Sequence, residues 1–142
     1  MVSLFNTTAE VSMRVLLVLD TVSVPISKTQ LVLLDFAATY SKDFGFTDKN
    51  LHGDGKYNMC ELAVRNERIG DAIPFLLKNG FISVINMDNG IGYCITSRGA
   101  QVCKATTMEY AQEYVQSIQE VQFSILSDGE RIMDLINNIV LN

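Results

Sequence analysis

A mainly α-helical fold with one small antiparallel β-hairpin is predicted by three features of the segment from Tyr57 to Ala105. Apolar residues recur there at helical spacing in two stretches, two alternating stretches then flank an Asn-Gly pair, and a short capped helix follows. Two helices joined by a turn and followed by such a ribbon are typical of a winged helix-turn-helix. We therefore expect one domain, with a winged-helix core at residues 57–105, N-terminal helices and a loop at 1–56, and a C-terminal helical extension at 106–142.

Two buried helices are expected before this core. Thr7 and Glu10, and again Ser27 and Gln30, have the spacing of a capping box, in which two side chains satisfy the first backbone N–H groups of a helix. The second box precedes the run from Leu31 to Ala38, which is apolar almost all round and should be buried on most sides.

Asp35 is the only charged residue in that run. It could be a catalytic or metal-binding carboxylate, or a structural anchor that pairs with an arginine such as Arg65 or Arg68. A lone carboxylate with no acidic or histidine companion cannot assemble a site, and a buried charge needs a partner. We therefore interpret Asp35 as a structural anchor.

The core itself is expected to contain two separate helices. Asn58 can cap the first, which should end near Arg65 or Asn66. Asp71 can cap the second, because Pro74 then falls in the first turn, where a missing backbone N–H costs nothing. Gly80 should end this helix as a left-handed residue, after a turn of about five residues between the two helices.

The hairpin is predicted from residues 81–87 and 91–96 around Asp88-Asn89-Gly90, since Asn-Gly supplies the positive φ angles of a tight turn. Alternation of Ile91, Tyr93 and Ile95 with smaller residues predicts one buried face. Thr96 should then cap a short helix.

The C-terminal extension is expected to form two helices. Thr106 and Glu109 have capping-box spacing, and an apolar stripe follows that includes Ala111, Tyr114, Val115, Ile118, Val121 and Ile125. Residues 127–130 predict a turn before a last helix, whose apolar face is Ile132, Leu135, Ile136 and Ile139. Both helices could complete a single core with the first two, or leave part of their surface to a partner chain.

Charge argues against a protein that binds DNA by itself. The net charge is −5, and residues 105–142 account for all of it, with one arginine against six acidic residues. Phosphate neutralisation supplies most of the affinity of DNA-binding proteins, yet the hairpin from Phe81 to Thr96 contains no Lys or Arg. The candidates for contact with a protein partner, or with DNA inside a larger complex, are Arg65, Arg68, Lys78, Arg98 and Lys104.

No catalytic, cofactor or metal site is predicted. Cys60, Cys94 and Cys103 form no CxxC pair, and the sequence has neither a phosphate loop nor a dinucleotide fingerprint. The only histidine, His52, could belong to a catalytic loop, but nothing in the sequence nominates a nucleophile, so we interpret residues 42–56 as a surface connection. Without a signal peptide or an apolar run of about 20 residues, the protein is expected to be cytoplasmic, with no membrane partner.

Several motifs together resemble a known bacterial family. They are Thr29–Phe36, Asn50-Leu51-His52, Glu61–Ile69, Leu76, Asn79–Ile82 and Leu126-Ser127-Asp128. Their order is similar to that of the winged-helix middle components of ABC-three component systems, encoded between an effector and an SMC-like ATPase with an ABC-type head. The resemblance implies a non-catalytic adaptor that bridges the ATPase subunit and the effector subunit in a Lamassu-like anti-phage defence complex. The family tends to have His-Pro where this chain has His52-Gly53, and Arg-Arg where it has Arg65-Asn66.

The alternative hypothesis is a transcriptional regulator that dimerises through its terminal helices and binds DNA with the helix after Asp71. The affinity of such a protein for its promoter should fall steeply as salt rises.

Overall fold

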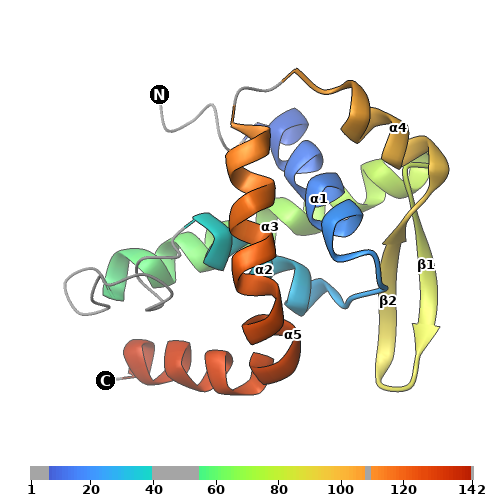
Figure 1. Cartoon of the computed structure of the whole chain (residues 1–142). Helices are drawn as coiled ribbons and strands as arrows, with labels where there is room; N and C mark the ends of the chain where they lie inside the picture. Colours follow the sequence, from blue (N-terminus) through green and yellow to red (C-terminus); the bar gives the residue numbers. More distant parts are fainter. Residues whose placement is uncertain (1–6, 40–54, 108–109, 142) are drawn as a thin grey trace.

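The computed structural model describes residues 7–39, 55–107 and 110–141, and it confirms a mainly helical fold with one hairpin (Figure 1). Within these ranges the helices are α1 (Thr8–Val22), α2 (Lys28–Thr39), α3 (Gly55–Lys78), α4 (Ser97–Ala105) and α5 (Ala111–Leu141). The strands β1 (Ile82–Met87) and β2 (Gly90–Ile95) form the antiparallel pair. No helix in the described ranges has both the length and the apolar character needed to cross a bilayer.

Both N-terminal capping boxes contribute hydrogen bonds. The Thr7 hydroxyl accepts from the Glu10 N–H at 3.2 Å at the start of α1. At the start of α2, the Ser27 hydroxyl accepts from the Gln30 N–H at 3.1 Å, and Gln30 Oε1 accepts from the Ser27 N–H at 3.0 Å. The predicted starts of both helices are therefore confirmed.

Helix α2 lies at the centre of the core. Every residue from Leu31 to Ala38 is buried, and α1, α3 and α5 all pack against this helix. The apolar stripe at the start of α5 faces the same core, since its buried members are Ala111, Tyr114, Ile118, Val121 and Ile125. This part of the C-terminal extension therefore completes a single core with the N-terminal helices. The side chains of residues 128–141, including the apolar face predicted there, lie outside the described side chains.

Helix α3 corrects the prediction of two separate helices. Residues 55–78 form one continuous helix that includes Gly70, Asp71 and Pro74, so the turn expected between the two helices is absent. Ile69, Ala72, Ile73 and Leu76 are all buried along one side of this helix. Burial of that stripe outweighs the local preference of glycine and proline for a break, because most helical stability in proteins comes from packing an apolar face. The end of the helix was predicted correctly: Gly80 has φ 74°, its N–H bonds to the Leu77 carbonyl, and the Phe81 N–H bonds to the Leu76 carbonyl.

The C-terminal extension also differs from the prediction. Residues 111–141 form one helix, without the break expected at residues 127–130. The ribbon of α5 does change direction towards its red C-terminal part (Figure 1). Thr106 ends α4 as its C-cap, and Glu109, its expected partner in a capping box, lies outside the described residues.

The hairpin pairs six residues of each strand, from Ile82 with Ile95 to Met87 with Gly90. Asp88 and Asn89 form the turn, and Gly90 has φ 133°, whereas Asn89 does not have the positive φ expected of it. At the base of the hairpin, the Thr96 hydroxyl caps α4 by accepting from the Gly99 N–H at 3.1 Å, as predicted. On the other edge of β2, Ile26 forms an isolated bridge with Tyr93.

Candidate functional site

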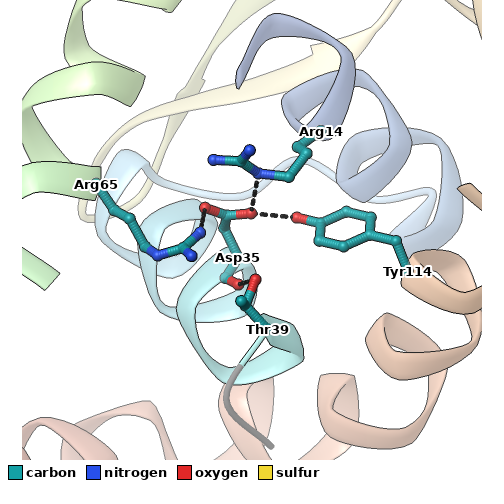
Figure 2. Close-up of polar contacts among 5 residues, drawn as sticks. All are labelled: Arg14, Asp35, Thr39, Arg65 and Tyr114. Carbon is teal, nitrogen blue, oxygen red and sulfur yellow. Dashed lines mark hydrogen bonds and ion pairs between the residues drawn. The ribbon is translucent and has the colours of Figure 1, made fainter. Parts of the chain in front are cut away.

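A buried polar centre joins four helices around Asp35 (Figure 2). Arg14 Nε on α1 donates to Oδ1 of this carboxylate at 2.9 Å, and Arg65 Nη1 on α3 donates to Oδ2 at 2.7 Å. The hydroxyl of Tyr114 on α5 donates to Oδ1 as well. The side chains of Asp35, Arg14 and Arg65 are 2–6% exposed, so these ion pairs are shielded from water.

Charge pairing determines the protonation state of this centre. Burial by itself raises the pKa of Asp35, but the charges of Arg14 and Arg65 and the hydrogen bond from Tyr114 hold that pKa below its ordinary value. Burial raises the pKa of Tyr114 well above its ordinary value, and the charge of Asp35 raises it further. At neutral pH the centre therefore contains an ionised carboxylate and a protonated tyrosine. The lowered pKa makes Asp35 a poor proton donor or acceptor near neutrality.

This arrangement contains the contact with an arginine expected for Asp35, made by Arg65. Arg14 and Tyr114 were not anticipated. Arg14 lies 21 residues from Asp35 in sequence and Tyr114 lies 79 residues away. The one available signal was that Arg14 is a lone cation in an otherwise apolar part of the first helix, where a buried charge would also need a partner.

The five cations proposed for contact with a partner or with DNA differ in burial and in the groups that surround them. Arg65 is buried against Asp35 and so cannot belong to a surface. Arg68 and Lys78 are exposed on α3, ten positions apart, which places their Cα atoms about 15 Å apart along the helix axis. Arg98 lies over the ring of Phe81 at the base of the hairpin, with its guanidinium carbon 5.3 Å from the ring centroid. Lys104 lies on α4 in a groove that also contains an acidic residue.

That groove lies between α1, α4 and α5 and has a volume of about 860 Å³. Its lining combines the charges of Asp20 and Lys104 with amide and hydroxyl side chains, among them Thr106, Thr107, Gln112, Gln116 and Gln119. Cys103 also lines it, and burial, together with the charge of Asp20, raises the pKa of this thiol to about 12. The thiol is therefore protonated at neutral pH and is a weak nucleophile.

The hairpin exposes an apolar face that the sequence suggested would be buried. Ile82, Val84 and Ile91 lie on the same face, because Val84 pairs with Tyr93, Ile82 with Ile95, and Asn86 with Ile91. Ile82 is only 3% exposed, whereas Val84 is 47% exposed and Ile91 is 54% exposed. The helices cover the base of the hairpin, and its turn end projects away from them (Figure 1). The prediction of one buried face is therefore wrong for the outer half of the hairpin.

Another exposed apolar side chain lies on α5. Phe123 is 77% exposed, although its neighbours at positions 121 and 125 are fully buried. Helix α5 runs near the middle of the view in Figure 1, and the hairpin lies apart from it at the right. Val24, Val64 and Phe75 are exposed as well, at 49%, 38% and 46%, but Phe123 is the most exposed large apolar side chain among the described residues.

The family model of the ABC-three component (ABC-3C) system Middle Component 2 matches residues 4–142. The chain belongs to this family. No curated protein and no solved structure matches it. Family membership makes this middle component one part of a system of several subunits, whose other components are its partners.

The loop around Leu51 and His52, which the sequence suggested as a surface connection, lies outside the described residues. No group of three or more metal-ligating side chains occurs among the residues that the structure describes.

Proposed function

We propose that this middle component is a non-catalytic, cytoplasmic adaptor in a bacterial anti-phage defence complex. It bridges an SMC-like ABC-type ATPase and an effector protein. Family membership supports a role as one subunit of such a system. The observation that carries the proposal is the exposed apolar face of the hairpin, formed by Val84 and Ile91 in a segment whose only charge is Asp88.

The chemistry of this face favours protein over nucleic acid. A contact with DNA requires cations that approach phosphates, and the hairpin has none. An uncharged apolar patch on a projecting element is typical of the centre of a protein–protein interface, where charged residues are depleted. The break between two helices that would set apart a recognition helix is also absent from α3. These observations favour the adaptor over the transcriptional regulator.

Bridging requires two separate surfaces. The hairpin face supplies one, and Phe123 with its surroundings on α5 supplies the other. Truncation or reversal of polarity at the centre of an interface often weakens binding strongly, whereas changes outside it have little effect. A single substitution in one surface should therefore weaken the contact made there without affecting the contact made by the other surface.

Co-expression with the two neighbouring components of the system tests this assignment. We expect Ile91→Lys to lose one of the two subunits on co-purification and Phe123→Lys to lose the other, each with an unchanged thermal transition. Gln101→Lys, at an exposed position of α4, is the matched control and should retain both subunits.

Two results would contradict the proposal. The first is that both lysine variants retain both subunits. The second is that the isolated protein binds a specific duplex tightly at physiological ionic strength, with an affinity that falls steeply as salt rises, which would favour the transcriptional regulator.

A further inference from the structure

The dipeptide Asn-Gly occurs twice in the sequence, in different structural surroundings. Asn79-Gly80 follows the end of α3, and Asn89-Gly90 lies where the hairpin turn meets β2. An asparagine followed by glycine is especially prone to lose its side-chain amide, because glycine has no Cβ to keep its backbone nitrogen away from the asparagine side chain. The surroundings of each pair therefore decide whether this reaction can occur.

Hydrogen bonds fix the first pair. Nδ2 of Asn79 donates to the Phe75 carbonyl at 2.8 Å, so the side chain points back along α3 and away from the Gly80 amide. That amide is bonded as well, since the Gly80 N–H donates to the Leu77 carbonyl at 3.1 Å. On the other side of the glycine, the Thr96 hydroxyl donates to the Gly80 carbonyl at 2.7 Å. A reaction between the Asn79 side chain and the Gly80 amide requires these contacts to open.

The second pair has no such restraint on its side chain. Within the described ranges, the side-chain amide of Asn89 has no hydrogen-bond partner, and Asp88, Asn89 and Gly90 are all exposed. A Cβ placed on Gly90 would meet no atom within 4 Å, so its backbone nitrogen is open to an approaching group. Gly90 pairs with Met87 at the last position of the ladder, at the end of the hairpin that projects away from the helices (Figure 1). Such ends open locally at little cost in free energy.

We propose that Asn89 is a site of spontaneous deamidation. The backbone nitrogen of Gly90 attacks Cγ of Asn89 and forms an N–C bond, its proton passes to the side-chain nitrogen, and that nitrogen leaves as ammonia. The product is a cyclic imide. Water then adds to one of the two carbonyl groups of the imide and opens the ring, which leaves either aspartate or isoaspartate at position 89. The overall change is the hydrolysis of one amide, with water as the co-reactant.

Either product changes the turn end of the hairpin. Aspartate adds a second carboxylate beside Asp88, which is the only charged residue from Phe81 to Thr96. Isoaspartate also carries the main chain through the side-chain carbon, which lengthens the backbone of the turn by one methylene. The turn then no longer fits a ladder in which Met87 pairs with Gly90. This chemistry does not depend on the adaptor role, because it needs only the chain itself and water.

Mass spectrometry of the full-length protein, aged in mildly alkaline buffer at body temperature, tests the site. Peptide fragmentation locates the modified residue, since the conversion of an amide to a carboxylic acid changes the mass. Asn89 should be converted at least about tenfold faster than Asn79, whose hydrogen bonds must first open. The products should include isoaspartate as well as aspartate, because the imide gives both. Equal rates at the two sites, or aspartate alone at position 89, would overturn the proposal.

The unfolded chain is the matched control for the effect of structure. In denaturant the contacts of Asn79 are lost, so the two sites should be converted at rates within about threefold of each other. A preference for Asn89 that persists unchanged in the unfolded chain would come from the neighbouring sequence and would contradict the role given to the hairpin turn.

Asn89→Gln tests the effect of the modification on the hairpin. Glutamine keeps the amide but would have to form a larger ring, so this variant should stay unmodified over the same period. In amide hydrogen exchange, Met87 and Gly90 should lose protection as the wild-type protein ages and keep it in the variant, because they form the pair next to the turn. Loss of protection in both proteins, or in neither, would show that conversion of Asn89 does not disturb the hairpin and would overturn that part of the proposal.

Discussion

Asp35 connects α2 to three other helices, because its carboxylate is shared by side chains from α1, α3 and α5. Two guanidinium groups and one carboxylate are buried together, with side chains that are 2–6% exposed. Such a set is stabilising only while it is complete, since removing one ion leaves its partners buried without compensation.

Replacing Asp35 by Asn should therefore cost about 3–5 kcal/mol in the free energy of unfolding, although the side chains have nearly the same shape. Chemical denaturation measures this change. The matched control is Asp20→Asn, at an exposed position in the groove, which should stay within about 0.5 kcal/mol of wild type. An equal loss in both variants would mean that Asp35 contributes no more than a surface carboxylate.

The same residue predicts how stability depends on pH. The folded-state pKa of Asp35 lies below the value of about 3.9 for an unperturbed aspartate, so folding favours the ionised form. Its contribution is complete above about pH 4 and is lost as the pH falls through the folded-state pKa. The difference in unfolding free energy between wild type and Asp35→Asn should thus be constant near neutrality and shrink in acid. A difference that stays constant down to pH 2 or so would contradict this assignment.

For single residues, hydrogen bonds between positions close in the sequence could be predicted, whereas contacts between distant positions could not. The bonds of Thr7, Ser27 and Thr96 span three residues each, so their spacing is visible in the sequence. That Asp35 needs an arginine follows from burial alone. Which arginines and tyrosine reach it depends on how four helices pack, and sequence spacing contains no information about that.

The elements show where local signals fail. Gly70, Asp71 and Pro74 are each common at helix ends, and together they predicted a break that α3 does not have. The buried stripe from Ile69 to Leu76 runs through this region and keeps it helical, which is tertiary packing overriding local preference. Hairpin alternation was likewise informative about which side chains share a face, but not about whether another element covers that face.

Two glycines allow a matched test of how tightly the elements are joined. A Cβ on Gly99 would lie 2.2 Å from the Phe81 carbonyl oxygen, so α4 can approach the base of the hairpin only with glycine there. Gly99→Ala should cost about 1–3 kcal/mol or more in unfolding free energy. A Cβ on Gly70 would meet only the flexible end of Lys28, at 3.1 Å, and Gly70→Ala should be neutral or stabilise α3 by up to about 1 kcal/mol. If both variants were equally stable in thermal denaturation, the close approach at Gly99 would not constrain the fold.

On the scale of the whole molecule, the buried core includes the base of the hairpin but not its turn end. Ile82 and Ile91 lie on the same face of the sheet, but helices cover only the first. The helices therefore divide the hairpin into a covered half near its base, which belongs to the core, and an exposed half near its turn, which is available for binding.

Truncation to alanine should distinguish these halves. Ile82→Ala should lower the free energy of unfolding by about 2–5 kcal/mol, as expected for a buried isoleucine. Ile91→Ala should change it by about 0.5 kcal/mol or less, because the side chain is largely solvated. Denaturant titration of the two variants measures both values, and a large loss at Ile91 would mean that the outer half of the hairpin belongs to the folding unit.

The polar centre around Asp35 can be completed only late in synthesis of the chain. Arg14, Asp35 and Arg65 leave the ribosome long before Tyr114, and until α5 emerges the carboxylate that they surround is open to solvent on the side that this helix closes. A nascent chain that stalls before residue 114 thus exposes to solvent both the ion pairs of Asp35 and the apolar side of α2 that α5 covers in the folded protein. Such a chain has the exposed apolar surface that makes incompletely folded proteins prone to aggregation and a target for chaperones.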